Sequence, residues 1–211
     1  MAKKFLKEKA NIICDTLERL YPQAVCSLVY STPYELLIAT RLSAQCTDAR
    51  VNIVTKELFS KYPTLESIAG AKLEDIEKIV HPCGLYKTKA KDILSIANDL
   101  ITRFGGQVPD NMEDLTSLSG VGRKTANLIL GDIFGKPAIV CDTHCIRITN
   151  RLGLSSTNDP YKCELQLREV LDPEKSSDLC HRLVLFGRDV CTARNPKCDE
   201  CPFDCKMRGK N

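Results

Sequence analysis

The apolar residues of this chain recur with the spacing of a helix far more often than with that of a strand. In Leu73–Val80 and Ile93–Leu100 they lie three and four residues apart, which places them on one helical face. Thr32-Pro-Tyr-Glu35 is a capping box with proline at the first helical position, and Asp159-Pro160 repeats the combination of cap and proline. Short β-branched pieces such as Ala138–Cys141 occur, but no run of alternating strands does. The sequence therefore predicts an all-α fold.

Composition and hydropathy exclude two other classes of protein. Of the 211 residues, 43% are hydrophobic and 27% are charged, a balance typical of globular proteins and not of disordered ones. Apolar runs such as Leu183–Gly187 are much shorter than the roughly 20 residues that a membrane-spanning helix needs. Residues Met1–Ala10 are charged and lack the apolar stretch of a secretory signal. We therefore expect a cytoplasmic protein with no membrane partner.

Four of the 12 cysteines are concentrated near the C-terminus, with the spacing Cys191-x6-Cys198-x2-Cys201-x3-Cys205. Four thiolates from one short segment suit either a tetrahedral Zn²⁺ or a [4Fe–4S] cluster. Structural zinc sites usually have two CxxC pairs separated by a longer spacer, whereas this segment has one CxxC and no nearby histidine. The pattern favours [4Fe–4S] over zinc.

The other eight cysteines are scattered singly along the chain. Without a secretory signal they are expected to stay reduced, and buried thiols behave as small hydrophobic residues. We expect all of them to be packing residues: Cys14, Cys26, Cys46, Cys83, Cys141, Cys145, Cys163 and Cys180.

Two cations, Arg194 and Lys197, lie in the short loop that Cys191 and Cys198 would fix at both ends. Positioned cations of this kind contact nucleic-acid phosphates. Cations on a surface loop also serve solubility alone, so both interpretations stay open for the loop by itself.

The most informative segment is Gly120-Val121-Gly122, which joins two predicted helices. Two glycines around one inward-pointing valine permit a tight turn whose backbone N–H groups face outward at a helix N-terminus. There the free donors and the helix dipole attract a phosphate. Because Arg123 and Lys124 follow at once, a nucleic-acid backbone is a better interpretation than an ordinary helix–helix turn.

The distribution of charge agrees with this interpretation. The formal net charge of +3 is too small for a general binder of polyanions, but it is unevenly spread. Between Gly120 and Arg151, basic residues outnumber acidic ones by the same excess. Such a cluster is often only a solvated face, and the adjoining turn is what favours a phosphate surface. The basic residues are Arg123, Lys124, Lys136, Arg147 and Arg151, and the acidic ones are Asp132 and Asp142.

Lys124 and Asp142 are the candidate catalytic residues. Lys124 lies in the first turn of the new helix, where the positive end of the dipole disfavours the ammonium form and favours an amine nucleophile. Asp142 is placed to cap the helix that starts after it, as an ionised carboxylate able to stabilise a cationic transition state. A solvated lysine and an ordinary helix cap are the simpler alternatives.

With these motifs in order, the chain resembles the endonuclease III family of DNA-repair glycosylases. The residues that carry the resemblance are Leu42-Ser-Ala-Gln45, Leu118-Ser-Gly-Val-Gly-Arg-Lys124-Thr-Ala-Asn127, Val140-Cys-Asp142-Thr-His144 and the C-terminal cysteines. Their order and spacing agree over essentially the whole chain. The resemblance implies a bifunctional DNA glycosylase and AP lyase of base excision repair that removes oxidised pyrimidines.

The resemblance also implies a role for each matching residue. Lys124 would attack the sugar C1′, form a Schiff base and nick the strand by β-elimination, with Asp142 as the catalytic carboxylate. Gln45 would fill the space left by the flipped nucleotide, Leu85 would separate neighbouring bases, and Cys191, Cys198, Cys201 and Cys205 would bind [4Fe–4S]. The remaining expected DNA contacts are Gly120, Val121, Gly122, Arg123, Thr125, His144, Arg194 and Lys197.

The implied architecture is two helical domains with a helix–hairpin–helix motif at residues 112–134 and an iron–sulfur cluster loop. Residues 1–24 would form an N-terminal helix that joins the cluster domain, 25–136 a helical bundle, and 137–211 the cluster domain. The implied partner is double-stranded DNA containing a damaged base or an abasic site, bound by a monomer that is nucleoid-associated if the cell is prokaryotic.

Two positions depart from the family pattern. Ser119 stands where the family usually has proline, and three residues separate Cys201 from Cys205 where five are common. Since extended chain spans about 3.3–3.6 Å per residue, the shorter spacing still reaches a cluster corner.

Three alternatives remain at this point. A monofunctional glycosylase of the same superfamily would activate water, but such relatives generally lack a lysine at the position of Lys124. A non-catalytic DNA-binding module with a structural zinc would account for the turn and the cysteines. A ferredoxin-like electron carrier would leave Gly120–Lys124 unexplained.

Overall fold

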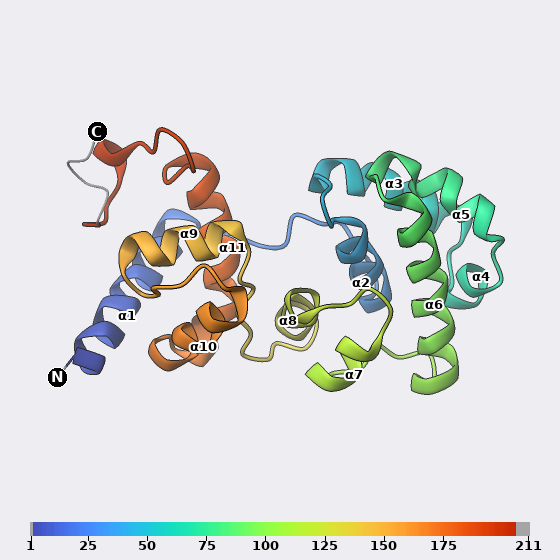
Figure 1. Ribbon diagram of the computed structural model, residues 1–211, viewed down its shortest axis with the longest axis horizontal. Coiled ribbons are helices and arrows are strands. Elements are labelled where there is room, and N and C mark those ends of the chain that lie inside the picture. Colours follow the sequence, from blue (N-terminus) through green and yellow to red (C-terminus); the bar gives the residue numbers. More distant parts are fainter. Residues whose placement is uncertain (1, 206–211) are drawn as a thin grey trace. The chain divides into compact units, whose positions relative to one another are not determined.

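The computed structural model describes residues 2–205, and within that range every regular element is a helix. The predicted all-α fold is thus confirmed for the described residues (Figure 1). The α-helices are α1 (Ala2–Leu20), α2 (Pro33–Leu42), α3 (Asp48–Lys61), α4 (Leu65–Ala69), α5 (Leu73–Val80), α6 (Tyr86–Phe104), α7 (Met112–Ser117), α8 (Arg123–Asp132), α9 (Thr143–Leu152), α10 (Pro160–Val170) and α11 (Ser176–Asp189). The 3₁₀ turns are η1 (His81–Cys83), η2 (Pro173–Lys175) and η3 (Cys198–Glu200).

The chain divides into two compact units. The hairpin unit is the continuous segment Cys26–Phe134, which contains α2 to α8. The cluster unit combines the described residues up to Val25 with those from Gly135 onward, and so contains α1 and α9 to α11.

The hairpin unit is organised around α6, the longest helix in it. Ile93, Ile96 and Leu100 of α6 are completely buried, as their helical spacing predicts. α4, α5 and α2 all pack against this helix, and α2 also packs against α8 (Figure 1). This arrangement brings the segments after α2 and before α6 close to the first turn of α6.

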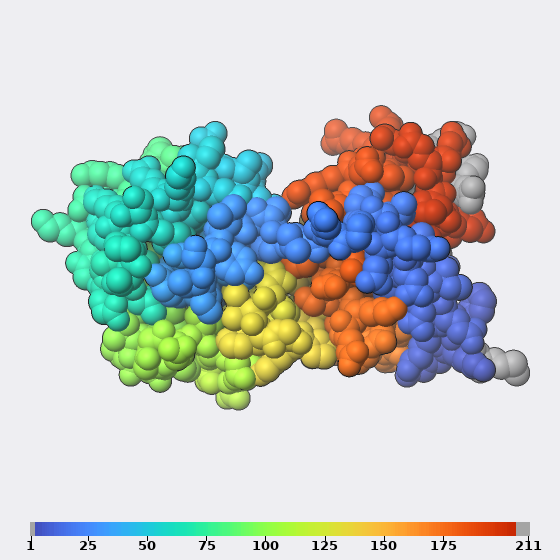
Figure 2. Space-filling view, turned by 180° about the vertical axis from the view of Figure 1, so that it is seen from behind, coloured from blue at the N-terminus to red at the C-terminus, as the bar shows by residue number. Residues whose placement is uncertain are grey.

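The cluster unit joins the two ends of the described chain. α1 packs against α10 and α11, which follow it by more than a hundred residues, and Figure 2 shows the surfaces of these segments adjoining. Leu17 of α1 and Phe186 of α11 are both fully buried. Arg182 of α11, itself almost buried, donates to Glu18 of α1 across 3.2 Å.

Capping explains why several helices begin where the sequence predicts. Thr32 and Glu35 form the reciprocal capping box at the start of α2. Asp159 caps α10 by accepting a hydrogen bond from the backbone N–H of Lys162. No described helix is long and apolar enough to cross a membrane.

The scattered cysteines follow the prediction with two exceptions. Cys26 and Cys46 are half-buried, whereas the other six are buried. Burial raises the pKa of Cys14 to about 11 and that of Cys26 to about 12, so both are neutral thiols at pH 7. Both therefore pack as apolar groups, although Cys26 retains contact with solvent.

Four of the six buried thiols gather in one place in the cluster unit. The buried thiol of Cys145 lies near those of Cys141, Cys163 and Cys180, which are also buried. Cys180 also accepts from the backbone N–H of Val140 across 3.2 Å. This group of thiols fills the core directly beneath the start of α9.

Candidate functional site

The glycine turn lies between α7 and α8 and has the geometry that the sequence predicts. α7 ends at Ser117. The carbonyl of its C-cap, Leu118, accepts from the Val121 N–H across 3.2 Å, and Val121 is buried. Gly120 has φ +69°, a left-handed conformation that glycine adopts without strain. Gly122 then stands at the N-cap of α8.

The turn is fixed from behind by two buried charges. Asp92 of α6 accepts from Arg41 Nε of α2 across 2.7 Å and from the Ser119 hydroxyl across 2.6 Å. The side chains of Arg41 and Asp92 are each only 11% exposed. A Cβ added at Gly120 would overlap the Arg41 side chain and lie 2.6 Å from Asp92 Oδ2. Gly120 is therefore required both for its conformation and for lack of space.

Ser119 explains one departure from the family pattern. The hydroxyl that replaces a proline ring is the group that binds the Asp92 carboxylate. A charge-assisted hydrogen bond of this kind restrains the turn as a proline would, by a different route. This contact therefore offsets the loss of the rigidity that a proline ring would give the turn.

The outer face of the turn is open. No side chain caps the N-terminus of α8, and a Cβ added at the exposed Gly122 would meet no atom within 4 Å. Uncapped N–H groups at a helix N-terminus form a ready anion-binding site. Arg123 and Thr125, in the same first turn, are half-buried. The geometry of the turn thus suits a phosphate.

Lys124 is exposed in the first turn of α8. Its neighbours in the helix, Ala126 and Asn127, are buried, so the helix is anchored while this amine faces solvent. The structure thus presents a primary amine two residues after Gly122, beside a turn whose open face suits a phosphate. A solvated lysine of no function would have the same exposure, and the adjoining turn is what distinguishes the two interpretations.

Asp142 is the N-cap of α9, as predicted. Its Oδ1 accepts a hydrogen bond of 2.7 Å from the backbone N–H of Cys145, and its side chain is half-buried. Asp142 belongs to the cluster unit and Lys124 to the hairpin unit.

Two arginines of α9 hold the start of the cluster loop, the segment 191–205. Arg147 donates to the carbonyls of Gly187 and Cys191 across 3.2 and 3.0 Å, and Arg151 donates to those of Thr192 and Ala193. The sequence indicates both only as members of the basic segment between Gly120 and Arg151. Their four-residue spacing places them on one face of α9, and this spacing is the sequence signal for their shared role.

His144 contacts one of these arginines, Arg147. It is half-buried, and its Nδ1 lies 3.1 Å from Nη2 of Arg147. Gly187 makes room for this pair, because an added Cβ there would overlap both side chains. His144 therefore stands beside Asp142 at the start of α9 and is braced toward the cluster loop.

The four clustered cysteines line one pocket together with Arg151, Val190, Pro196 and Lys197. Arg151 Nη1 donates to Cys191 Sγ across 3.2 Å and so restrains this side chain at the pocket. The loop is anchored beyond the pocket by Phe203, whose ring meets that of Phe186 edge-on at 5.5 Å. The four cysteines are thus brought together around one partly open space.

The donor set suits the [4Fe–4S] cluster that the sequence favours. Each of four thiolates can bind a different iron of such a cluster. The four cysteines line one pocket, and no histidine is among its lining residues. The residues present therefore fit this cluster.

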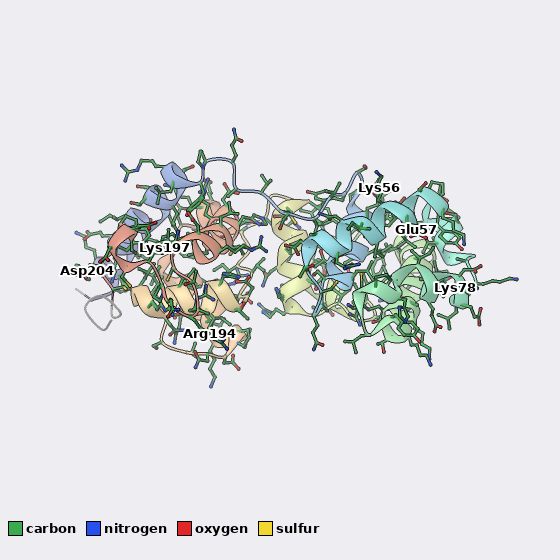
Figure 3. All side chains as sticks on the ribbon, turned by 90° about the horizontal axis from the view of Figure 1, so that it is seen from above. Lys56, Glu57, Lys78, Arg194, Lys197 and Asp204 are labelled. Atoms are coloured by element: carbon green, nitrogen blue, oxygen red, sulfur yellow. The ribbon has the colours of Figure 1, made fainter. Side chains whose placement is uncertain are left out.

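The two cations of the loop between Cys191 and Cys198 differ in whether nearby carboxylates compensate their charge (Figure 3). Arg194 is exposed and makes no side-chain hydrogen bond or ion pair within the described part of the chain. Lys197 lies 3.6 Å from Glu200 and 3.8 Å from Asp189, so its charge is partly compensated. Arg194 is the better placed of the two for an external phosphate.

Gln45 and Leu85 share an unusual backbone conformation. Both have positive φ, +56° and +49°, and both side chains are exposed, Leu85 by 58%. Among the described non-glycine residues only Asn195, in the cluster loop, shares this property. Positive φ is costly for bulky residues and is concentrated at functional sites. All three lie in segments that the sequence assigns to DNA contact.

Comparison with known protein families agrees with these features. Residues 38–173 match the model of the HhH-GPD superfamily of base excision DNA repair proteins. Residues 191–203 match the iron–sulfur binding domain of endonuclease III.

Individual relatives cover nearly the whole chain. Endonuclease III of Bacillus subtilis is 44% identical over 90% of this chain and 87% of its own, and that of Synechocystis is 43% identical over 92% and 90%. A solved endonuclease III–DNA complex, trapped as a covalent intermediate, is 42% identical with a TM-score of 0.87 over 93% of this chain and 92% of its own. A thermostable thymine-DNA glycosylase is 27% identical with a TM-score of 0.81 over 92% and 93%.

Gly120→Ala tests the buried brace behind the turn. The added methyl group would displace Arg41 and Asp92 and force a left-handed alanine, so we expect a loss of about 2–4 kcal/mol in the free energy of unfolding. Gly122→Ala, with open space around its Cβ, is the matched control and should lose only about 0.5–1 kcal/mol, because alanine is a poorer N-cap than glycine. Denaturant unfolding of both variants measures this, and equal losses would contradict the brace.

Proposed function

The chain belongs to the HhH-GPD superfamily of base excision DNA repair proteins and, within it, to the endonuclease III family, and on this premise we propose which of its residues perform the reaction. It is a DNA glycosylase and AP lyase whose C-terminal segment carries a [4Fe–4S] cluster. The assignments to residues, the substrate range and the monomeric state are our proposal.

Lys124 is the nucleophile of this proposal. Its neutral amine attacks C1′ of the damaged nucleotide, the N-glycosidic bond breaks, and the base leaves with the bonding electron pair and takes up a proton. The sugar ring opens to a Schiff base between C1′ and Nζ. Loss of a proton from C2′ then expels the 3′ phosphate by β-elimination, and water releases the enzyme from the imine. This assignment rests on one observation: the exposed amine of Lys124 lies two residues after Gly122, the last residue of the open anion-binding turn.

Asp142 supplies a carboxylate at the start of α9. One of its oxygens is occupied by the Cys145 N–H, which fixes the side chain, while the half-buried position leaves it accessible. In our proposal its negative charge stabilises the oxocarbenium character that C1′ acquires as the base departs. His144, which follows next but one, contacts the DNA backbone.

Base removal requires the target nucleotide to leave the helix stack, a step that costs a few kcal/mol and less for a damaged pair. Gln45 and Leu85 are proposed to act in this step. The amide of Gln45 occupies the vacated position, and the apolar Leu85 separates the neighbouring bases. Their exposure and positive φ support these roles.

Phosphate contacts come from the glycine turn and the cluster loop. Gly120 to Thr125 bind one phosphate through backbone N–H groups, and Arg194 reaches another from the loop, with a smaller contribution from Lys197. The cluster, when bound, fixes this loop, which has little core of its own. The substrate class is oxidised pyrimidines in double-stranded DNA, acted on by a monomer in the cytoplasm or nucleoid.

A monofunctional glycosylase of the same superfamily is the alternative to this assignment of Lys124. That reading requires an activated water in place of an amine. The exposed Lys124 favours the lyase reading, and the next experiment separates the two.

Lys124→Ala should abolish the covalent adduct that borohydride forms between the protein and abasic-site DNA, since no Schiff base can form. The control is Lys136→Ala, which removes another lysine from the same basic segment and should leave trapping intact. Adduct is measured as a shifted band on a denaturing gel. Trapping that persists without Lys124 would place the nucleophile elsewhere, and no trapping by the wild type would favour the monofunctional reading.

Asp142→Asn tests the negative charge of this residue separately from its role as the N-cap of α9. The amide oxygen can still accept from the Cys145 N–H, so melting should change little, whereas base excision should fall by about 10²–10⁴-fold. Asp142→Ala should in addition lose about 1 kcal/mol of stability with the cap. Single-turnover excision and thermal melting measure the two effects. Undiminished excision by Asp142→Asn would remove the catalytic role.

Arg194→Ala should reduce the salt dependence of DNA binding by about one counterion, because log K falls with log salt in proportion to the phosphates contacted. Lys197→Ala should have a smaller effect, since two carboxylates already compensate its charge. Lys56→Ala, on α3 of the hairpin unit, is the control for loss of any surface cation (Figure 3). Equal slopes for Arg194→Ala and Lys56→Ala would contradict the contact.

A further inference from the structure

Lys89 of α6 is a buried lysine that the proposed mechanism does not use. Its side chain is 0% exposed and is among the largest fully buried side chains of the described chain. Lysine is rarely buried so completely unless every donor is paired. Burial lowers its pKa from the ordinary value, so its environment must provide compensating acceptors.

Those acceptors are three backbone carbonyls from two separate segments. Lys89 Nζ donates to Leu42 O across 2.9 Å, to Ala44 O across 2.7 Å and to Cys83 O across 2.8 Å. An ammonium group has three hydrogens, so its donor capacity is completely used. Leu42 and Ala44 lie at the end of α2 and just beyond it, and Cys83 ends η1.

Each segment leads directly to a residue with positive φ. Ala44 immediately precedes Gln45, and Cys83 is two residues before Leu85. The backbone N–H of Lys89 also donates to Leu85 O across 3.0 Å. Lys89 therefore contacts the backbone of two segments, the one that carries Gln45 and the one that carries Leu85.

A second contact joins the same two segments. The thiol of Cys83 lies near that of Cys46, which follows Gln45 directly. This proximity supports the ammonium bridge, but a contact between two thiols holds the backbone less firmly than three charge-assisted hydrogen bonds. Lys89 is the stronger tie.

We propose that Lys89 is a positioning residue that sets the spacing of the Gln45 and Leu85 segments, so that both side chains enter the DNA stack together. This inference rests on the proposed function, because it takes Gln45 and Leu85 as the inserting residues. Lys89 touches neither DNA nor the reacting sugar. It acts through the three carbonyls, and without them each segment relaxes independently.

The experiment compares Lys89→Met with Lys91→Met. Methionine keeps the apolar stem and removes every donor, and Lys91 is an exposed lysine one half-turn further along α6. The first readout is single-turnover cleavage of an abasic site in duplex and in single-stranded DNA, expressed as a ratio. Only the duplex requires insertion into a stack. Loss of alignment of about 1 Å costs about 10²-fold, so we expect the ratio to fall about 10- to 100-fold for Lys89→Met and to stay constant for Lys91→Met.

The second readout is spectroscopic. A 2-aminopurine base opposite a tetrahydrofuran abasic analogue becomes more fluorescent when a side chain unstacks it. We expect this increase with the wild type and Lys91→Met, and a reduced increase with Lys89→Met at saturating protein. Both readouts are taken below the melting temperature of each variant. If Lys89→Met does not fold, Lys89→Gln, which keeps a neutral donor, replaces it.

The outcomes distinguish a failure of the Lys89 inference from a failure of the proposed function. An unchanged ratio together with unchanged fluorescence overturns the role of Lys89, even if Lys89→Met melts at a lower temperature. A wild type that forms the borohydride adduct but gives no fluorescence increase removes the insertion step, and the Lys89 inference with it. Absence of the adduct with the wild type contradicts the proposed function itself.

Discussion

The carboxylate of Asp92 is the contact on which the geometry of the hairpin unit depends. It is buried on α6, pairs with Arg41 of α2 and accepts from Ser119 of the turn, so it joins three segments that are distant in sequence. Removing one partner of such a buried pair is strongly destabilising because an uncompensated charge remains. Gly120 leaves room for this pair, and the open face of the turn is on the other side. The anion-binding property of the outer face therefore depends on charges behind it.

α6 carries a second buried charge one turn earlier. Lys89 and Asp92 are three residues apart and so lie on the same face of the helix, where one organises carbonyls and the other organises a cation and a hydroxyl. The two groups differ in sign and in partners, yet each connects α6 to the C-terminal end of α2, at Arg41 for Asp92 and at Leu42 for Lys89. A helix with a well-packed apolar face is rigid enough to hold both groups in register. The hairpin unit thus combines an ordinary core with two polar contacts that set the position of its surface segments.

The local features of this fold could be predicted from the sequence, and the long-range polar contacts could not. The capping box at Thr32, the cap at Asp142 and the periodicity of α5 and α6 depend on residues within one turn of each other, and these predictions are confirmed. Lys89 and Arg41 carry no such signal, because their partners are backbone carbonyls or side chains 45 to 51 residues away. Composition assigns lysine and arginine to the surface, and only tertiary structure shows that these two are inside. Likewise, the sequence places Arg147 and Arg151 only within a basic segment, and the structure shows that they hold the cluster loop through backbone carbonyls 44 and 41 residues away.

The pairing of α1 with α10 and α11 has a consequence for synthesis on the ribosome. α1 is translated first, but the helices that cover its apolar face begin only at Pro160. At about 5–20 residues per second, roughly 7–30 s pass before those partners emerge, long enough for the continuous segment Cys26–Phe134 to be complete. The nascent chain therefore carries an unpaired amphipathic helix beside a folded unit, and cluster insertion comes last. A chaperone or the ribosome surface has time to shield Leu17 and its neighbours before the two ends of the chain meet.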